Sequence, residues 1–240
     1  MNRNFKPSTS AEITFIRQLR KVGVAAGHIV GLYIDGTHII DAVAMQAALK
    51  AYSKALDPWA RNQAKKMLLT VENANKRAMK SNSKLIGQGL RLVAESAVGE
   101  ASRKLMDEQV ELIKSIPLKA GERAQKLSME AVLNGERASE VAKRLIDSGK
   151  VAESDANLIA RTEVARASSV LTQARATAIG STNYVWRTSK DAAVRESHKE
   201  MEGKVERWDS PPELSDGTTG NPGTFPNCRC YPEPIFTDLF

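Results

Sequence analysis

Cysteine is nearly absent from this sequence. Two cysteines occur among 240 residues, and both lie in one Cys-x-Cys pair, Cys228 and Cys230. A disulfide between them would close a very small, strained ring, so the chain offers no disulfide framework for an oxidising compartment. The first ten residues are polar and do not resemble a secretory signal. We therefore expect reduced thiols and a cytoplasmic setting.

Long hydrophobic runs and aromatic residues are also scarce. The apolar stretch at residues 22–34 is short and is interrupted by three glycines and His28, whereas a membrane-spanning helix needs about 20 apolar residues. We expect no membrane contact. Aromatic residues make up 5% of the chain, and only Tyr52 and Trp59 lie among its densest basic residues. This scarcity argues against a platform on which nucleic-acid bases stack.

Acidic residues are too few to balance the basic ones in the first part of the chain. Residues 1–150 hold 25 Lys and Arg against 15 Asp and Glu, whereas residues 151–240 hold 10 against 13. The densest basic group comprises Lys50, Lys54, Arg61, Lys65, Lys66, Lys76, Arg77, Lys80 and Lys84. Two interpretations stay open. These side chains contact a polyanion such as nucleic acid, or they form a solvated helix face, as most charge runs do.

Proline and glycine are sparse between residues 39 and 116, which predicts long helices. We expect a first helix from Ser8 or Ser10 to Arg20, then a turn at Asp35-Gly36. Helix breaks are expected near residues 57–58 and 80–83 and at Pro117. Later helices are predicted at residues 119–133, 136–147 and 154–179, the last one capped by Ser154.

The pattern changes in the C-terminal part of the chain. It predicts a strand at residues 183–188, a helix at 191–201, a second strand at 204–208 and a turn-rich loop at 210–225. The predicted fold class is therefore mainly α, with an elongated N-terminal helical region followed by a small α+β C-terminal domain. We place the first at residues 1–129, as a partly basic arm or bundle, and the second at residues 130–240.

Glu163 lies in an apolar stripe of the predicted helix 154–179. Because an unpaired buried charge is costly, this carboxylate needs a partner. Arg161 is two residues away and points to another side of the helix, so Arg187 or Arg195 is the expected partner. The alternative is that Glu163 is a general base in a pocket.

Asp191, Arg195 and His198 are spaced i, i+4, i+7. This spacing puts their side chains on one face of a helix, where Asp191 also fits an N-cap. His198 fits a structural role, a general base or a metal ligand.

His198, Cys228 and Cys230 together offer one imidazole and two thiolates, which are good zinc ligands. The Pro- and Gly-rich loop before the cysteines could fold them back beside His198. A fourth ligand is missing from any strong pattern, and Asp191, Asp216 or water would have to serve. The alternative is a pair of reduced, partly buried cysteines that behave as small apolar residues. Arg229 would lower the pKa of a neighbouring thiol, but no base for a catalytic cysteine is evident.

The order of these motifs resembles the phage Mu protein F-like family, the head morphogenesis or minor head proteins of tailed phages. The resemblance covers residues 130–235. It rests on the helix start at Gly135–Leu145, Ala160-Arg161-Thr162-Glu163, Trp186-Arg187-Thr188 with Asp191, Val194-Arg195 with His198 and Gly203, and Pro222-Gly223 with Asn227-Cys228-Arg229-Cys230.

The resemblance implies a non-enzymatic virion protein in few copies, located in the head interior or at the portal vertex, and in host cytoplasm during assembly. Its implied partners are the portal protein, other capsid or scaffold proteins and packaged double-stranded DNA. It implies a structural core made by Arg161, Glu163, Trp186, Asp191, Arg195, His198, Gly203, Cys228 and Cys230. Some relatives have Cys-x-x-Cys at the positions of Arg195 and His198, and a His before Cys-Arg-Cys where this chain has Phe225. No cofactor is expected apart from the zinc alternative.

Two other functions stay open from the residues themselves. One is a metal-dependent hydrolase or nuclease with Glu163, His198 and the cysteines in its site. The other is a non-specific DNA-binding protein that uses the basic group from Lys50 to Lys84.

Overall fold

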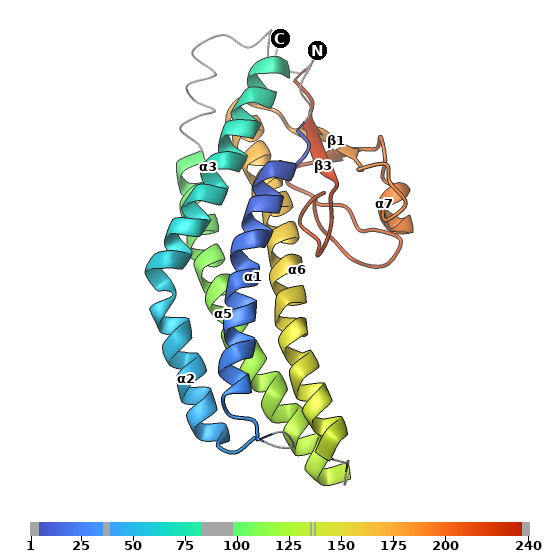
Figure 1. Cartoon of the computed structure of the whole chain (residues 1–240). Helices are drawn as coiled ribbons and strands as arrows, with labels where there is room; N and C mark the ends of the chain where they lie inside the picture. Colours follow the sequence, from blue (N-terminus) through green and yellow to red (C-terminus); the bar gives the residue numbers. More distant parts are fainter. Residues whose placement is uncertain (1–4, 36–38, 83–97, 135, 137, 237–240) are drawn as a thin grey trace. The chain divides into compact units, whose positions relative to one another are not determined.

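The computed structural model describes residues 5–35, 39–82, 98–134, 136 and 138–236. Within them the helices are α1 (Thr9–Gly31), α2 (Ala42–Ala55), α3 (Asp57–Asn82), α5 (Val98–Asn134), α6 (Ala138–Ala178) and the short α7 (Glu196–Lys199). The strands are β1 (Asn183–Arg187), β2 (Val205–Arg207) and β3 (Tyr231–Pro234) (Figure 1). The chain is mainly α with a small α+β C-terminal region, which confirms the predicted fold class. The predicted turn at Asp35-Gly36 lies partly outside the described residues.

The chain divides into two compact units. The sheet unit comprises Met1–Glu12, Lys65–Met106 and Arg161–Phe240, and the helical unit comprises Ile13–Ala64 and Asp107–Ala160. Helices α1, α3, α5 and α6 each contribute residues to both units. The division into residues 1–129 and 130–240 follows the sequence order instead and stays a prediction.

Helix α1 begins where the sequence predicts but ends later. Ser8 Oγ accepts a hydrogen bond from Ala11 N at 3.3 Å, which satisfies an amide of the first turn. The helix continues to Gly31 rather than ending at Arg20. Its second half buries side chains at helical spacing: Val22, Ala26 and Val30. The burial of this stripe outweighs the low helix propensity of the glycines between them.

The break at residues 57–58 is confirmed. Helix α2 ends at Ala55 and α3 begins at Asp57, so Pro58 occupies the first turn, where the missing amide costs no hydrogen bond. Helix α3 ends at Asn82, inside the predicted break at residues 80–83.

The predicted boundary at Pro117 is wrong, because Pro117 lies inside α5. A proline inside a helix costs about 3 kcal/mol through a lost hydrogen bond and a clash with the preceding turn. Around it, Ile113, Ile116 and Ala120 are at most 1% exposed. Burial of these side chains on both sides of the proline keeps the helix continuous.

The two helices predicted at residues 136–147 and 154–179 form one helix, α6. Neither Ser148-Gly149 nor Ser154 interrupts it. The buried positions recur without a phase change across the expected break: Leu145, Ala152, Ala156 and Ala160. A continuous apolar stripe holds the helix together where local turn residues suggested an end.

The helical unit is a bundle in which α1, α2, α5 and α6 run side by side (Figure 1). Its core consists of small and medium side chains from all four helices: Ala26, Val30, Met45, Leu49, Ala120, Ala124, Ala131, Val141, Leu145 and Ala152. The many alanines allow close approach of the helix backbones. No helix in the described ranges combines the length and the apolar character that a membrane span requires.

Gly23 lies where the backbones of α1 and α6 pack closely together. A Cβ atom at this position would lie 2.8 Å from the Ala152 carbonyl oxygen, which is backbone and cannot turn aside. We expect Gly23→Ala to lower the free energy of unfolding by about 1–3 kcal/mol through overpacking. The measurement is urea unfolding followed by far-ultraviolet circular dichroism.

Gly31 in the same helix is the matched control for Gly23. A Cβ atom there meets nothing within 4 Å, and alanine has the higher helix propensity by up to about 1 kcal/mol. Gly31→Ala should therefore leave stability unchanged or raise it. Equal losses for the two variants would contradict the close packing at Gly23.

The sheet unit contains a three-stranded antiparallel sheet in the order β2-β1-β3. Strands β1 and β2 confirm the predicted strands, whereas β3 was not predicted. Val185 of β1 pairs with Val205 on one side and Glu233 on the other. Strand β1 buries alternate residues, Tyr184 and Trp186. These two side chains form the centre of a core completed by Ala176, Met201, Trp208, Leu214, Cys228 and Cys230.

Candidate functional site

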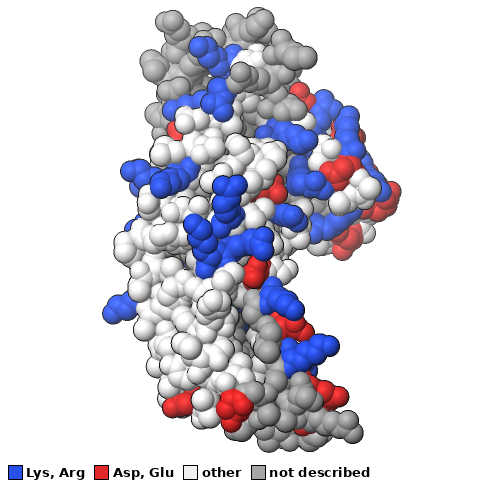
Figure 2. Space-filling view, viewed as in Figure 1, with Lys and Arg blue, Asp and Glu red and all other residues white. Residues whose placement is uncertain are grey.

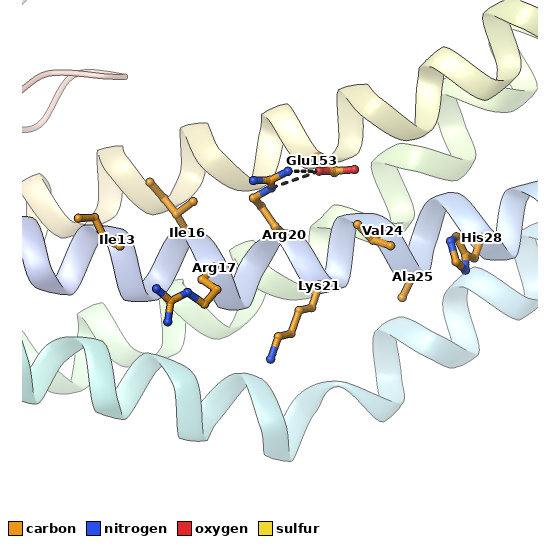
Figure 3. Close-up of a pocket in the computed structure, with 9 residues that line it drawn as sticks. All are labelled: Ile13, Ile16, Arg17, Arg20, Lys21, Val24, Ala25, His28 and Glu153. Carbon is orange, nitrogen blue, oxygen red and sulfur yellow. Dashed lines mark hydrogen bonds and ion pairs between the residues drawn. The ribbon is translucent and has the colours of Figure 1, made fainter.

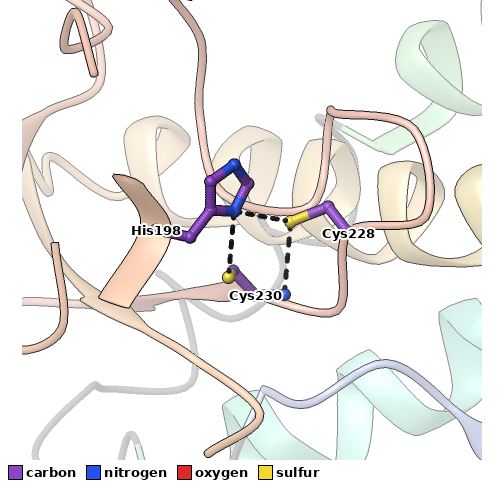
Figure 4. A group of neighbouring side chains, drawn as sticks. All are labelled: His198, Cys228 and Cys230. Carbon is purple, nitrogen blue, oxygen red and sulfur yellow. Dashed lines mark hydrogen bonds between the residues drawn. The ribbon is translucent and has the colours of Figure 1, made fainter. Parts of the chain in front are cut away.

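The structure brings His198, Cys228 and Cys230 together in the sheet unit. His198 Nδ1 lies 3.5 Å from Cys228 Sγ and 3.4 Å from Cys230 Sγ. The amide of Cys230 donates to Cys228 Sγ at 3.4 Å. All three residues are at most 4% exposed, and Figure 4 shows both sulfurs directed at the same imidazole nitrogen. The predicted convergence of the Cys-x-Cys pair on His198 is thus present; we call these residues the His-Cys-Cys cluster.

Aromatic rings fix the imidazole of His198. Trp186 lies edge-on to it with ring centroids 5.6 Å apart, and Phe225 packs on it at 5.0 Å. The amide of Gly203 donates to the Trp186 carbonyl at 2.9 Å. Gly203 has a φ of 82°, a conformation that glycine adopts without strain, and this residue reverses the chain between α7 and β2. The side chain of His198 is therefore held by packing and not by a flexible loop.

The segment that carries the cysteines is fastened to α6. The amide of Asn227 donates to Thr162 Oγ1 at 3.0 Å, and Asn227 has a φ of 55°, which asparagine tolerates better than most residues. Gly223 lies so close to this helix that a Cβ there would be 3.1 Å from the Ala165 carbonyl. These contacts explain why the turn-rich loop has one defined path.

The two thiols of the cluster are not equivalent. A hydrogen bond from Cys230 lowers the pKa of Cys228 strongly, and hydrogen bonding to His198 lowers it further against the opposing effect of burial. The pKa of Cys230 is raised by its hydrogen bond to Cys228 and by burial. Two sulfurs this close cannot both be thiolates without a cation to neutralise them.

Asp216 holds α7 through a hydrogen bond from Ser197. Its carboxylate accepts hydrogen bonds from Thr218 N at 3.0 Å, Thr218 Oγ1 at 2.5 Å and Ser197 Oγ at 2.8 Å. The Thr218 side chain and amide, and then Ser197, lower the pKa of Asp216 from 3.8 to about 2. Asp216 thus positions α7 through the residue next to His198 and is not itself a ligand of the cluster.

This depressed pKa has a consequence for stability at acid pH. A lowered pKa in the folded state gives a stabilising contribution that is complete above 3.8 and disappears as the pH falls through about 2. We expect Asp216→Asn to be less stable than the wild type at pH 6 and the difference to shrink between pH 4 and pH 2. Urea unfolding midpoints over this range measure it. A difference that is independent of pH would contradict it.

A cavity of about 70 Å³ lies beside the cluster and is lined by Ser189, Ala193, Val194, Arg195, His198, Asn227, Cys228, Arg229 and Cys230. Its two arginines are held at its rim. Arg195 Nη2 donates to the Pro226 carbonyl at 2.6 Å, and Arg229 Nη2 donates to Asp191 Oδ1 at 2.7 Å. No carboxylate is among the lining residues, so Glu163, the carboxylate predicted as a general base, is not part of this cavity.

The predicted helix 191–201 and its shared face are wrong. Only Glu196–Lys199 is helical, so Asp191, Arg195 and His198 do not share a helix face. Asp191 instead accepts a hydrogen bond from the amide of Ala193 at 3.0 Å and pairs with Arg229. A short polar side chain that bonds its own backbone two residues on favours a turn over a helix.

The predicted partner of Glu163 is also wrong. Glu163 is buried, as expected, but it pairs with Arg166 in the same helix, at 2.9 Å, and not with Arg187 or Arg195. Arg187 instead bonds Glu233 of β3. The i, i+3 spacing already permits the pair with Arg166, so the sequence contained the signal. Glu163 is engaged in an ion pair and does not line the cavity.

The other residues predicted for the structural core divide into two groups. Trp186 is fully buried, like His198 and both cysteines. Arg161, Arg195 and Gly203 are exposed, and Arg161 pairs with Glu12 at 3.4 Å. Apart from Glu163, which pairs with Arg166, the buried members are therefore the cluster itself and Trp186, which packs on His198.

The basic residues lie on α2 and α3. Lys50, Lys54, Arg61, Lys65, Lys66, Arg77 and Lys80 are exposed and Lys76 is half-buried, whereas Lys84 lies outside the described residues. Acidic neighbours neutralise two of them, since Arg61 pairs with Asp57 and Lys76 with Glu72. Over the part of the sheet unit that contains β1 and α7, basic and acidic side chains are mixed (Figure 2).

Sequence reasoning did not predict the surface groove along α1 in the helical unit. This groove, about 680 Å³ in volume, is lined by Ile13, Ile16, Arg17, Arg20, Lys21, Val24, Ala25, His28 and Glu153. Figure 3 shows Arg20 reaching Glu153, and Arg20 Nη2 lies 2.7 Å from Glu153 Oε2. The ion pair occupies the one carboxylate of the lining, so the groove contains no set of residues suited to catalysis.

Comparison with known proteins agrees with the geometry of the sheet unit. The family model described as Phage Mu protein F like protein matches residues 122–232. This range includes every member of the His-Cys-Cys cluster and the aromatic residues that enclose it. Residues 122–232 are thus similar to the phage Mu protein F-like family. We call residues 122–232 the Mu F-like segment.

A curated relative of this chain has no assigned function in its description. An uncharacterized protein of Haemophilus influenzae is 36% identical over 126 residues, which are 52% of this chain and 27% of that protein. The chain thus matches about a quarter of the length of this curated relative. No solved structure matches the chain.

Proposed function

We propose that this protein is a minor head protein of a tailed phage that acts in head morphogenesis at the portal. The observation that supports this proposal is the match of the family model, Phage Mu protein F like protein, to residues 122–232. The helical unit is the proposed contact for the portal protein or for other capsid and scaffold proteins.

The residues of the Mu F-like segment support a structural role and not a catalytic one. His198, Cys228 and Cys230 are buried in the core of the sheet unit. Glu163 is neutralised by Arg166, and the cavity beside the cluster lacks a carboxylate. General acid–base catalysis needs a proton-transfer group within reach of substrate, and the Nδ1 atom of the buried His198 is instead engaged with both cysteine sulfurs. The metal-dependent hydrolase or nuclease is therefore the less supported function.

One face of α3 supports a contact with packaged double-stranded DNA. At about 100° per residue, Lys65, Lys66, Lys76, Arg77 and Lys80 fall within an arc of roughly 120° on this helix. Over these residues the helix is roughly 23 Å long, enough to follow several phosphates. Affinity for duplex DNA that falls steeply with added salt would support this contact, because phosphate contacts release counterions. Affinity that is insensitive to salt would contradict it.

Purified particles test the main proposal. We expect the protein to co-purify with the portal protein from infected or induced host cytoplasm and to remain in mature virions at low copy number, as quantitative mass spectrometry would show. A phage that lacks the gene should yield fewer DNA-filled heads or particles that fail to deliver DNA. Particles of normal number, composition and infectivity without the protein would overturn the proposal.

A further inference from the structure

The His-Cys-Cys cluster has the composition and the geometry of a metal site. The ligand atoms of His198, Cys228 and Cys230 all lie within 4.8 Å of one another. We propose that these three residues bind one zinc ion, with His198 Nδ1 and the two cysteine thiolates as its protein ligands. This inference concerns the sheet unit alone and does not depend on the role in head assembly.

The distances within the cluster fit tetrahedral zinc. Zinc–nitrogen bonds of about 2.0–2.1 Å and zinc–sulfur bonds of about 2.3 Å place the nitrogen and a sulfur roughly 3.5 Å apart at the tetrahedral angle. The two Nδ1–Sγ distances in the cluster are 3.5 and 3.4 Å. Both nitrogen–sulfur distances of the cluster therefore match those around one tetrahedral zinc ion.

The chemistry of the ligands selects the metal. Thiolates are soft ligands and imidazole suits zinc, whereas calcium and magnesium prefer carboxylate and carbonyl oxygens. A divalent cation would also neutralise two sulfurs that repel each other when both are ionised. The rings of Trp186 and Phe225 around His198 give the site the apolar surroundings that limit access of water to the zinc–sulfur bonds.

The fourth position of the zinc faces the cavity. Among the residues that the structure describes, no further His, Cys, Asp or Glu joins this group of ligand atoms. The cavity has a volume of about 70 Å³, whereas one water molecule needs only about 10–15 Å³ of free space. We therefore assign a water molecule as the fourth ligand. The three protein ligands are buried in the core of the sheet unit, so we assign the zinc a role in the stability of that core.

The position of the ligands in the chain explains what the zinc does. His198 lies on α7 and the cysteines lie just before β3, so the ion joins the two ends of the connection that contains β2 and the turn-rich loop. Closing such a connection by ordinary contacts costs conformational entropy. A bound zinc ion offsets that cost and couples metal binding to the folding of the sheet unit.

Metal analysis of the full-length protein tests this inference. The protein is produced without a histidine tag in zinc-supplemented medium, dialysed against metal-free buffer and analysed by inductively coupled plasma mass spectrometry. We expect one zinc per chain. His198→Asn, Cys228→Ser and Cys230→Ser should each retain less than a tenth of that zinc. His28→Asn, which changes a histidine of the helical unit, is the matched control and should retain all of it.

Two measurements on the wild type keep the test decisive if a variant fails to fold. Cobalt substituted for zinc should show a thiolate-to-cobalt charge-transfer band and the strong visible bands of four-coordinate cobalt. Blocking two thiols per chain with a mercurial reagent should release one zinc, detected with a colorimetric chelator. At free zinc 100-fold above the Kd, the thermal midpoint should rise by roughly 5–10 °C.

The same distances would arise if the thiols and the imidazole were simply hydrogen-bonded to one another, and this alternative gives the opposite results. In that case dialysed wild-type protein holds no zinc, cobalt gives no charge-transfer band and the thermal midpoint does not depend on zinc. Zinc retained equally by the wild type and by a folded Cys228→Ser variant would place the ion elsewhere. Either result would overturn the proposed site.

Discussion

Replacing Trp186 with alanine is expected to lower the free energy of unfolding by about 3–5 kcal/mol. Trp186 is fully buried in β1, at the centre of the sheet-unit core. Its ring contacts His198 edge-on and packs against Phe225 at 6.4 Å. Its removal would leave a large cavity that rigid neighbours, Tyr184 and Trp208 among them, cannot fill. Guanidinium unfolding followed by circular dichroism measures the loss.

Two further substitutions in the same sheet make this result specific. Val205 of β2 is 56% exposed, so Val205→Ala should change stability by no more than about 0.5 kcal/mol. Trp186→Phe keeps an aromatic ring and should cost clearly less than Trp186→Ala. If Trp186→Ala cost no more than Val205→Ala, the core as described would be wrong.

The convergence of His198 with the cysteines was predictable from the sequence, and so were the strands β1 and β2. In each case the signal is local. The alternation of residue types in residues 183–188 predicts a strand. The Pro- and Gly-rich loop before the Cys-x-Cys pair allows the chain to turn back toward His198. The break at residues 57–58 belongs to the same class, because Pro58 has one favourable place in a helix.

The features that were missed depend on tertiary packing. Pro117 and the residues around Ser154 look like helix ends, but the buried stripes of α5 and α6 continue through them. The i, i+4, i+7 spacing from Asp191 to His198 fits a helix, yet Asp191 bonds its own turn and Arg229. Strand β3 has only four residues, and two of them are prolines. Its sequence therefore shows no strand pattern, and the strand forms because it pairs with the edge of β1.

A polar network inside the sheet unit was missed for the same reason. Arg175 of α6 is 1% exposed; it donates to Asn75 Oδ1 of α3, and its Nη2 lies 3.6 Å from Glu72 Oε1. Asn75 Nδ2 in turn donates to Thr172 Oγ1 at 2.6 Å. Asn75 and Arg175 are 100 residues apart in the sequence, and nothing local marks either of them as buried.

Arg175→Ala is accordingly expected to cost about 3–5 kcal/mol of unfolding free energy. Removing one partner of a buried charged network leaves the other unsatisfied, here the side-chain oxygen of the buried Asn75. Arg77→Ala is the matched control, because this arginine of α3 is exposed and its loss should cost no more than about 0.5 kcal/mol. Urea unfolding of both variants gives the comparison.

A double-mutant cycle separates the network from simple loss of volume. Asn75→Ala alone should cost about 1–3 kcal/mol, because it leaves the Arg175 guanidinium and the Thr172 hydroxyl without this partner. If the two residues act together, the double variant should lose at least about 1 kcal/mol less than the two single losses added together. Additive losses would show that the hydrogen bond between Arg175 and Asn75 contributes nothing to stability.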